Sequence, residues 1–150
     1  MRIFDSLDAF VAALGGDIGV SPWMTVDQAM IDAFAEVSGD DQWIHVDPAR
    51  CRRELGTGTI AHGYLLLSLL AGLARRTYRI EGISRAVNYG SDKVRFLSPV
   101  PAGSRVRARF HLAEAERDGA RRKILNKAQL EIEGQEKPAL IAEVLTVFYV

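Results

Sequence analysis

The chain has 150 residues, of which 48% are hydrophobic and 25% charged, proportions that exclude a disordered or low-complexity scaffold. This length predicts one domain, residues 1–150, with enough chain to bury one core. Lys and Arg number 19, as do Asp and Glu, so the formal net charge is zero and does not favour nucleic acid or an acidic membrane as partner.

The single cysteine, Cys51, cannot form an internal disulfide and excludes a Cys-rich zinc site. The longest apolar run, Tyr64 to Leu70, is far shorter than the roughly 20 residues that cross a bilayer. The first ten residues, MRIFDSLDAF, lack the uninterrupted apolar segment of a signal peptide. We therefore expect a cytoplasmic protein without membrane insertion.

The first half of the chain is predicted to be mainly helical, because capping residues precede apolar residues at helical spacing. The pair Asp47-Pro48 is a strong start signal, with an acid at the cap and proline at the first helical position. The predicted elements are a helix from Asp5 or Ser6 to Leu14, an extended stretch Gly19–Thr25, and helices Gln28–Val37 and Pro48–Leu55.

The stretch Gly63–Leu73 follows and is apolar almost all the way round, with Arg75 and Arg76 near its end. A helix without a polar face is expected to be buried on every side. In a chain of this length, that pattern predicts a central helix wrapped by a sheet.

The second half is predicted to form strands, because apolar and polar residues alternate along it. Asp118-Gly119 indicates a hairpin. With the early extended stretch, the pattern predicts an α+β fold of about five strands around one buried helix. The predicted strands here are Ala86–Leu97, Ser104–Leu112, Lys123–Glu133 and Leu140–Val150.

The residues best suited to chemistry lie between positions 38 and 63. Asp40 and His45 are five apart, across a predicted loop. A carboxylate and an imidazole that converge can hold one water and move its proton near neutral pH, because free histidine titrates near ~6.5. On spacing alone, a helix cap for Asp40 and a solvated loop side chain for His45 remain alternatives.

Gly63 begins the predicted central helix, so its N–H would be an unpaired donor at the positive end of that helix. Such a donor can polarise a carbonyl oxygen, and the missing side chain lets a ligand approach closely. Tight backbone packing is the alternative role for this glycine. Together with Asp40 and His45, it supplies the groups needed to add water across a double bond conjugated to a carbonyl.

These residues resemble the motifs of the MaoC-like dehydratases, which include the (R)-specific enoyl-CoA hydratases. The family pattern is roughly Ser/Thr-Gly-Asp-x-Asn-Pro-hydrophobic-His, followed by His-Gly at the start of a buried helix. Gln42-Trp43 replaces Asn-Pro and is similar to a nodulation-protein-N-like branch. The matching segments are Ser38–His45, Asp47-Pro48, Ile60–Gly63 and Lys93–Pro101.

The resemblance implies a hot-dog fold, an antiparallel sheet wrapped around a long central helix, in a homodimer with an acyl-CoA tunnel near the interface. It implies syn hydration of a trans-2-enoyl-CoA to an (R)-3-hydroxyacyl-CoA by water held between Asp40 and His45, with Gly63 N–H on the thioester oxygen. No metal and no cofactor are expected, since CoA is part of the substrate. Substrate-binding candidates are Gln42, His62 and Tyr64.

Two other functions share this fold. A hot-dog thioesterase would need a carboxylate poised against the thioester carbonyl, often from the central helix, and Gly63–Leu73 contains no acid. A non-catalytic acyl-binding subunit of a heteromeric dehydratase would commonly lack the Asp/His pair. The basic stripe Arg105, Arg107 and Arg109 is interpreted as a solvated strand face, with CoA phosphates as the alternative partner.

Overall fold

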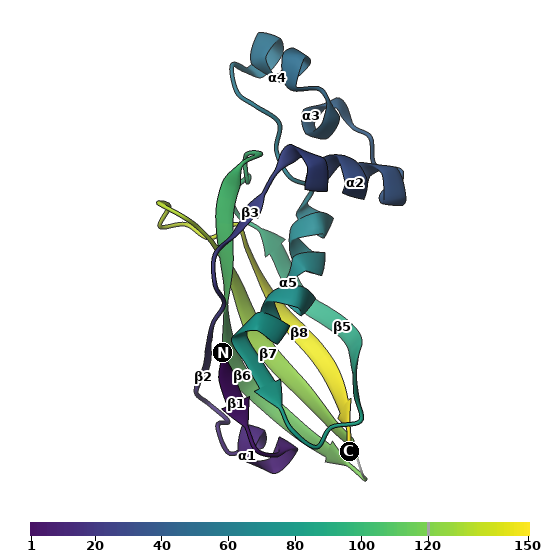
Figure 1. The fold of residues 1–150 in the computed structure, drawn as a ribbon, viewed down its shortest axis with the longest axis vertical. Helices are drawn as coiled ribbons and strands as arrows, with labels where there is room; N and C mark the ends of the chain where they lie inside the picture. Colours follow the sequence, from purple (N-terminus) through teal and green to yellow (C-terminus); the bar gives the residue numbers. More distant parts are fainter. Residues whose placement is uncertain (120) are drawn as a thin grey trace.

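An antiparallel sheet curves around the long helix α5 (Gly63–Thr77) in the computed structural model, which describes residues 1–119 and 121–150 (Figure 1). The strand order is β2-β6-β7-β8-β5, and β3 also pairs with β6. This arrangement is the predicted hot-dog fold. The strands are β2 (Asp17–Val20), β3 (Met24–Val26), β5 (Arg85–Phe96), β6 (Ser104–Asp118), β7 (Arg121–Ile132) and β8 (Leu140–Tyr149).

The alternation predicted for the second half of the chain is confirmed by the burial of β6. Val106, Ala108 and Leu112 are each 0% exposed and point towards the core, as the period-two pattern requires. Strands β6 and β7 pair as far as Asp118 and Arg121. The predicted hairpin signal therefore lies at their connection, of which residue 120 is outside the described residues.

The predicted helix starts are confirmed by their caps. The side chains of Ser6, Asp27 and Asp47 each accept a hydrogen bond from the backbone N–H three residues further on. These bonds begin the first, second and fourth helices of the chain. The helices before α5 are α1 (Leu7–Val11), α2 (Gln28–Ser38), α3 (Trp43–Val46) and α4 (Pro48–Leu55).

Three short elements were not predicted. The four-residue helix α3 stands where a loop was expected, and a parallel pair forms between β1 (Arg2–Phe4) and β4 (Tyr78–Ile80). Elements of three or four residues are too short to show a period in the sequence. The early extended stretch is also divided into β2 and β3. Between them the Ser21 N–H donates to the carbonyl of Ala108, but the N–H of Ala108 donates to the Ser21 hydroxyl oxygen instead of to a backbone carbonyl.

The prediction that α5 is buried on every side was wrong. Leu65, Leu66, Leu70 and Leu73 are buried against the sheet, whereas Tyr64 on the opposite face is 70% exposed. The sheet covers one side of the helix only, so small and apolar residues on the other side face an open region. Strand β5 borders this region, and all but one of its positions are exposed.

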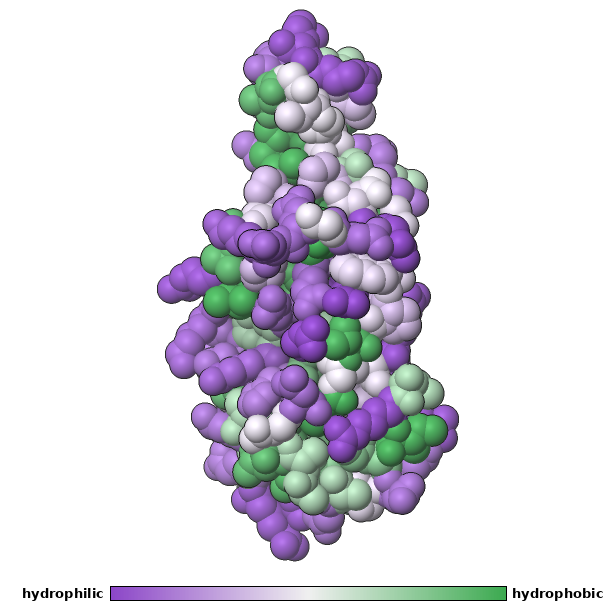
Figure 2. Space-filling model, turned by 90° about the vertical axis from the view of Figure 1, so that its left-hand side faces the viewer, coloured by the Kyte–Doolittle hydropathy of each residue, from purple (hydrophilic) through white to green (hydrophobic). Residues whose placement is uncertain are grey.

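The molecule is elongated, with α2, α3 and α4 gathered at one end beyond the start of α5, and the C-terminus near the other (Figure 1). Hydrophilic residues cover much of one side, with apolar groups between them (Figure 2). Among the described residues, no helix has both the length and the apolar character that crossing a bilayer demands.

Candidate active site

Three side chains from different parts of the fold converge where the small helices meet the start of α5. Asp40 follows the left-handed cap Gly39 of α2, His45 lies on α3, and His62 is the N-cap of α5. An oxygen of Asp40 and one ring nitrogen of each histidine all lie within 4.8 Å of one another. The expected convergence of Asp40 and His45 is therefore present, and His62 joins them.

The ring of His45 is buried, and its Nδ1 lies 2.7 Å from the carbonyl oxygen of Ile60. A carbonyl only accepts, so Nδ1 carries the proton and Nε2 keeps a free lone pair. The backbone is fixed too, because Gln28 Nε2 donates to the carbonyl of His45 over 2.8 Å. His45 thus presents a hydrogen-bond acceptor that is suited to take a proton.

His62 hydrogen-bonds the loop that carries Asp40. Its Nε2 donates to the carbonyl oxygen of Asp40 over 2.8 Å, and its ring stacks on His45 with centroids 3.8 Å apart. Its Nδ1 is buried without a hydrogen-bond partner in the part of the chain that the structure describes. Such an orphaned atom is expected at a site that a ligand or water completes.

Asp40 is exposed, in contrast to the two histidines. Its backbone is held on both sides, because its N–H donates to Ser38 Oγ over 3.2 Å and its carbonyl accepts from His62. The loop is thus ordered while the carboxylate remains accessible. A carboxylate and two neutral imidazoles are also a ligand set that a divalent metal ion accepts.

Gly63 is the first residue of α5, so its N–H has no acceptor within the helix. A Cβ added there would lie 3.0 Å from three ring atoms of Phe96. Only glycine allows this ring so close to the helix start. The site therefore offers a backbone donor beside the Asp40–His45–His62 cluster, under an aromatic ring that sequence patterns did not single out.

The other two candidates lie at the surface near this cluster. Gln42 is the N-cap of α3, and its carbonyl accepts from the N–H of His45 over 2.9 Å. The ring of Tyr64 packs edge-on against Phe96 with centroids 5.9 Å apart. Their proposed contacts with substrate stay predictions.

Gln28 and Thr59 support the site and were not predicted. Thr59 is buried and donates its hydroxyl hydrogen to Gln28 Oε1, while Gln28 in turn holds the backbone of His45. The contact joins residues 31 positions apart, so no local pattern reveals it. It connects α2 and the segment before α5 directly behind the imidazole of His45.

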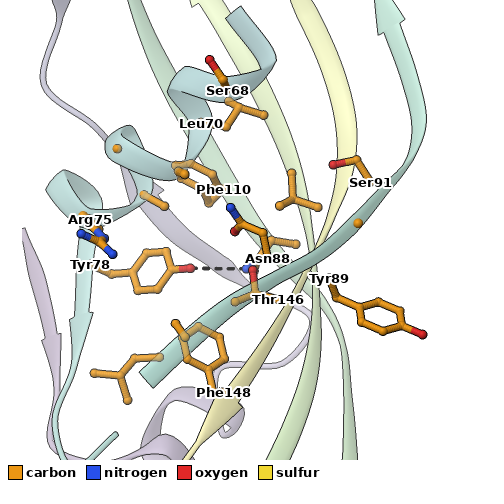
Figure 3. Close-up of a pocket in the computed structure, with 18 of the residues that line it drawn as sticks. Ser68, Leu70, Arg75, Tyr78, Asn88, Tyr89, Ser91, Phe110, Thr146 and Phe148 are labelled. Carbon is orange, nitrogen blue, oxygen red and sulfur yellow. Dashed lines mark hydrogen bonds between the residues drawn. The ribbon is translucent and has the colours of Figure 1, made fainter. Parts of the chain in front are cut away.

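A cavity of about 1040 Å³ lies along α5, between the helix and strands β5 and β8 (Figure 3). Its wall begins at Leu67, one helical turn after Gly63, and continues to Tyr78 beyond the helix end. Most of the lining is apolar, including Leu70, Phe110 and Phe148. Such a cavity suits an extended apolar group.

The basic stripe on β6 is paired with acids of β7. Arg107 and Arg109 both contact Glu131, over 2.6 and 3.1 Å, and Arg105 contacts Glu133 over 2.7 Å. Burial raises the pKa of Glu131, but the two guanidinium groups outweigh this effect and the net pKa is lowered. These ion pairs favour the interpretation of the stripe as a solvated strand face over a site for CoA phosphates.

Comparison with known proteins gives matches over nearly the whole chain. The family described as "MaoC like domain" matches residues 9–135. The chain is 44% identical over 144 residues to 3-hydroxyacyl-thioester dehydratase Z of Mycobacterium tuberculosis, covering 95% of each. It is 43% identical over 145 residues to nodulation protein N of Rhizobium leguminosarum, covering 95% of this chain and 90% of that protein.

A solved structure has the same fold. The (R)-hydratase from A. caviae, described as involved in PHA biosynthesis, superposes with a TM-score of 0.72 at 24% identity. The match covers 89% of this chain and 94% of that one. At this identity the likeness establishes the hot-dog architecture alone.

Proposed function

This chain belongs to the MaoC-like domain family, and we propose that it catalyses the reversible syn hydration of a trans-2-enoyl-CoA to an (R)-3-hydroxyacyl-CoA. It is a hydro-lyase, and its relatives include a named 3-hydroxyacyl-thioester dehydratase. The observation that carries the finer proposal is the convergence of Asp40, His45 and His62 within 4.8 Å beside the free N–H end of α5.

Asp40 and His45 activate the water in this mechanism. The water donates one hydrogen bond to the Asp40 carboxylate and one to the unprotonated Nε2 of His45, which directs an oxygen lone pair towards the β-carbon. The water oxygen bonds to that carbon while His45 takes its proton. His45 then gives this proton to the α-carbon on the same face and returns to its neutral form, so one water molecule is added in total and no other reactant is consumed.

Gly63 stabilises the negative charge that develops on the thioester oxygen. Its N–H stands at the positive end of the 15-residue helix α5, where backbone donors favour an anion. In the mechanism, this N–H binds the oxygen as the α-carbon becomes part of an enolate.

The proposed reaction needs neither a metal nor a redox cofactor, because the thioester activates the double bond and Gly63 binds the developing oxyanion. Asp40, His45 and His62 are nevertheless chemically competent to ligate a divalent ion. Dialysis against EDTA is expected to leave crotonyl-CoA turnover unchanged. Loss of activity that zinc restores would contradict the metal-free mechanism.

A homodimer is the proposed assembly. Strand β5 pairs with β8 along one edge, and none of the described residues pairs with its other edge. A twelve-residue edge strand with nearly all positions exposed is unusual unless another strand covers it. A second copy of β5 would extend the sheet across the two chains and cover the open face of α5.

The reaction is tested by mixing the protein with crotonyl-CoA and following the absorbance of the conjugated enoyl thioester. Loss of this absorbance without release of free thiol is the expected result. Release of thiol would instead indicate a thioesterase, for which Gly63–Thr77 provides no carboxylate. An unchanged signal over a series of enoyl chain lengths would contradict the proposed function.

A further inference from the structure

The side chains of β7 that point into the core are apolar, except for the amide of Asn126. The neighbouring inward positions Ile124, Ala128 and Leu130 are buried hydrophobic residues, and Asn126 between them is only 2% exposed. Its Oδ1 has no hydrogen-bond partner in the described chain. A buried polar atom without a partner destabilises the fold, so its presence here requires an explanation.

Asn126 lines the cavity beside α5 together with Tyr78, and the two side chains touch. Nδ2 of Asn126 donates to the hydroxyl oxygen of Tyr78 over 3.5 Å, the contact drawn as a dashed line in Figure 3. The Tyr78 ring is held by stacking on Phe10, with centroids 5.2 Å apart. Both polar groups are therefore fixed at one place in the cavity wall.

This pair offers at least one acceptor and one donor to the cavity, because the amide nitrogen also keeps a second N–H. The acceptor is Oδ1 of Asn126, and the donor is the O–H of Tyr78, whose oxygen already accepts from the amide. Turning the amide by 180° exchanges the roles but leaves one donor and one acceptor. Burial raises the pKa of Tyr78 to about 12, so the hydroxyl keeps its proton at neutral pH.

The position of Asn126 and Tyr78 along the cavity determines which part of a ligand can contact them. Tyr78 follows the last residue of α5, and Gly63 is the first, so the helix separates them by about 22 Å at 1.5 Å per residue. The cavity follows the helix between Leu67 and Tyr78 with mostly apolar walls. An acyl chain that leaves a thioester at Gly63 and follows α5 would bring its distal carbons to Asn126 and Tyr78.

We propose that Asn126 and Tyr78 form a hydroxyl-binding subsite, and that the protein takes acyl thioesters with a hydroxyl group far from the thioester. This inference rests on the proposed function. A hydroxyl donates to Oδ1 of Asn126 and accepts from Tyr78, which satisfies both groups. A carboxylate would face the amide oxygen. Arg79, which is engaged with Glu81, and Arg75 also line this cavity, so ligands with a terminal carboxylate are included in the test.

The test is calorimetric titration with saturated acyl-CoA thioesters of increasing chain length, each without a substituent, with a terminal hydroxyl and with a terminal carboxylate. These ligands cannot be hydrated, so binding is measured separately from chemistry. At the matching length, the hydroxylated ligand is expected to bind about tenfold more tightly than the plain one. Equal binding at every length, or tightest binding of the carboxylate, would overturn the inference.

Two variants locate the effect. Asn126→Leu and Tyr78→Phe are each expected to abolish the roughly tenfold preference while binding the plain acyl-CoA at least as well. Tyr89→Phe is the matched control: Tyr89 lines the same cavity on β5, but its ring points away from the Tyr78 hydroxyl (Figure 3), so the preference should persist. Tyr78→Phe keeps the ring and tests the subsite even if Asn126→Leu folds poorly.

Crotonyl-CoA hydration, measured on the same preparations, separates the two hypotheses. Its short acyl group does not extend to Tyr78, so the wild type and all three variants should hydrate it at similar rates. Normal hydration without preference for the hydroxyl would overturn the subsite alone. Absence of both hydration and acyl-CoA binding would overturn the proposed function and the subsite with it.

Discussion

Single side chains determine the proposed chemistry, and the hydrogen bonds of His45 are the clearest example. The bond from its Nδ1 to Ile60 selects the tautomer whose Nε2 can accept a proton. No sequence pattern specifies this, because Ile60 lies 15 positions away and contributes only its backbone. The motif predicted that Asp40 and His45 would converge, but the hydrogen bond that selects the His45 tautomer depends on the fold.

Replacing either member of the pair is expected to stop catalysis without unfolding the protein. Asp40→Asn and His45→Gln should each lower turnover by about a hundredfold or more, because an amide supplies neither the negative charge nor the basic nitrogen that activates the water. Crotonyl-CoA hydration measures the rate, and thermal melting measures the fold. Asp41→Asn, at the adjacent exposed acid, is the matched control and should remain active. Near-wild-type rates for either variant would refute its assigned role.

Gly63→Ala is expected to reduce turnover more than stability. The added Cβ would meet Phe96 at 3.0 Å, but that ring is 46% exposed and free to move aside, so melting should change little. The displaced ring and the added methyl group should disturb the contact between this N–H and the thioester oxygen. The expected decrease in rate is at least about tenfold. Gly58→Ala, which meets nothing within 4 Å, serves as control. Equal activity with normal melting would remove the role of Gly63.

At the scale of elements, the sequence predicted the helices whose ends are stabilised by hydrogen bonds between residues close together in the chain. The caps Ser6, Asp27 and Asp47 were recognisable because each bonds a residue three positions away. The parallel pair β1–β4 was not, because it joins residues far apart in the sequence, such as Arg2 and Tyr78, in strands of only three residues. The short helix α3 is likewise positioned by contacts to α2 and to the segment before α5 rather than by its own sequence.

The cross-strand ion pairs of β6 and β7 predict a pH dependence of stability. The pKa of Glu131 is lowered in the folded protein, so its contribution is present above the unfolded value of 4.5 and is lost as pH falls through the folded pKa. Glu131→Gln should therefore lower the free energy of unfolding at neutral pH, by about 1 kcal/mol or less. The difference from wild type should disappear in strong acid.

Urea denaturation of both proteins at neutral and acidic pH measures this difference. Glu133→Gln removes a more exposed partner of the same stripe and should cost less, because its pair with Arg105 is nearly half exposed on both sides. A difference for Glu131→Gln that is the same at both pH values would contradict the role of its charge.

At the scale of the whole molecule, the open face of α5 limited the prediction from sequence. An all-apolar helix indicates burial, but not whether the covering surface comes from the same chain. Leu70 is buried against the chain's own sheet, while Tyr64 and nearly all of strand β5 remain exposed. The hot-dog architecture was therefore predictable from the motifs, whereas the one-sided wrapping was not.

The proposed dimer predicts that a charge on β5 separates the chains. Val87 is 45% exposed on this strand, and Val87→Lys should shift the sedimentation coefficient from dimer to monomer at equal concentration. Wild-type protein should sediment as a dimer. A monomeric wild type would contradict the assembly. A Val87→Lys variant that remains a dimer on dilution, as the wild type does, would contradict it too.

The hydrogen bond between His62 and the backbone of Asp40 spans 22 positions and fastens the first turn of α5 to the loop behind α2. If α2, α3 and α4 shift relative to the sheet, Asp40 and His62 must therefore move together. In the proposed mechanism, this bond helps to keep constant the distance between the water held by Asp40 and His45 and the thioester oxygen bound by the N–H of Gly63.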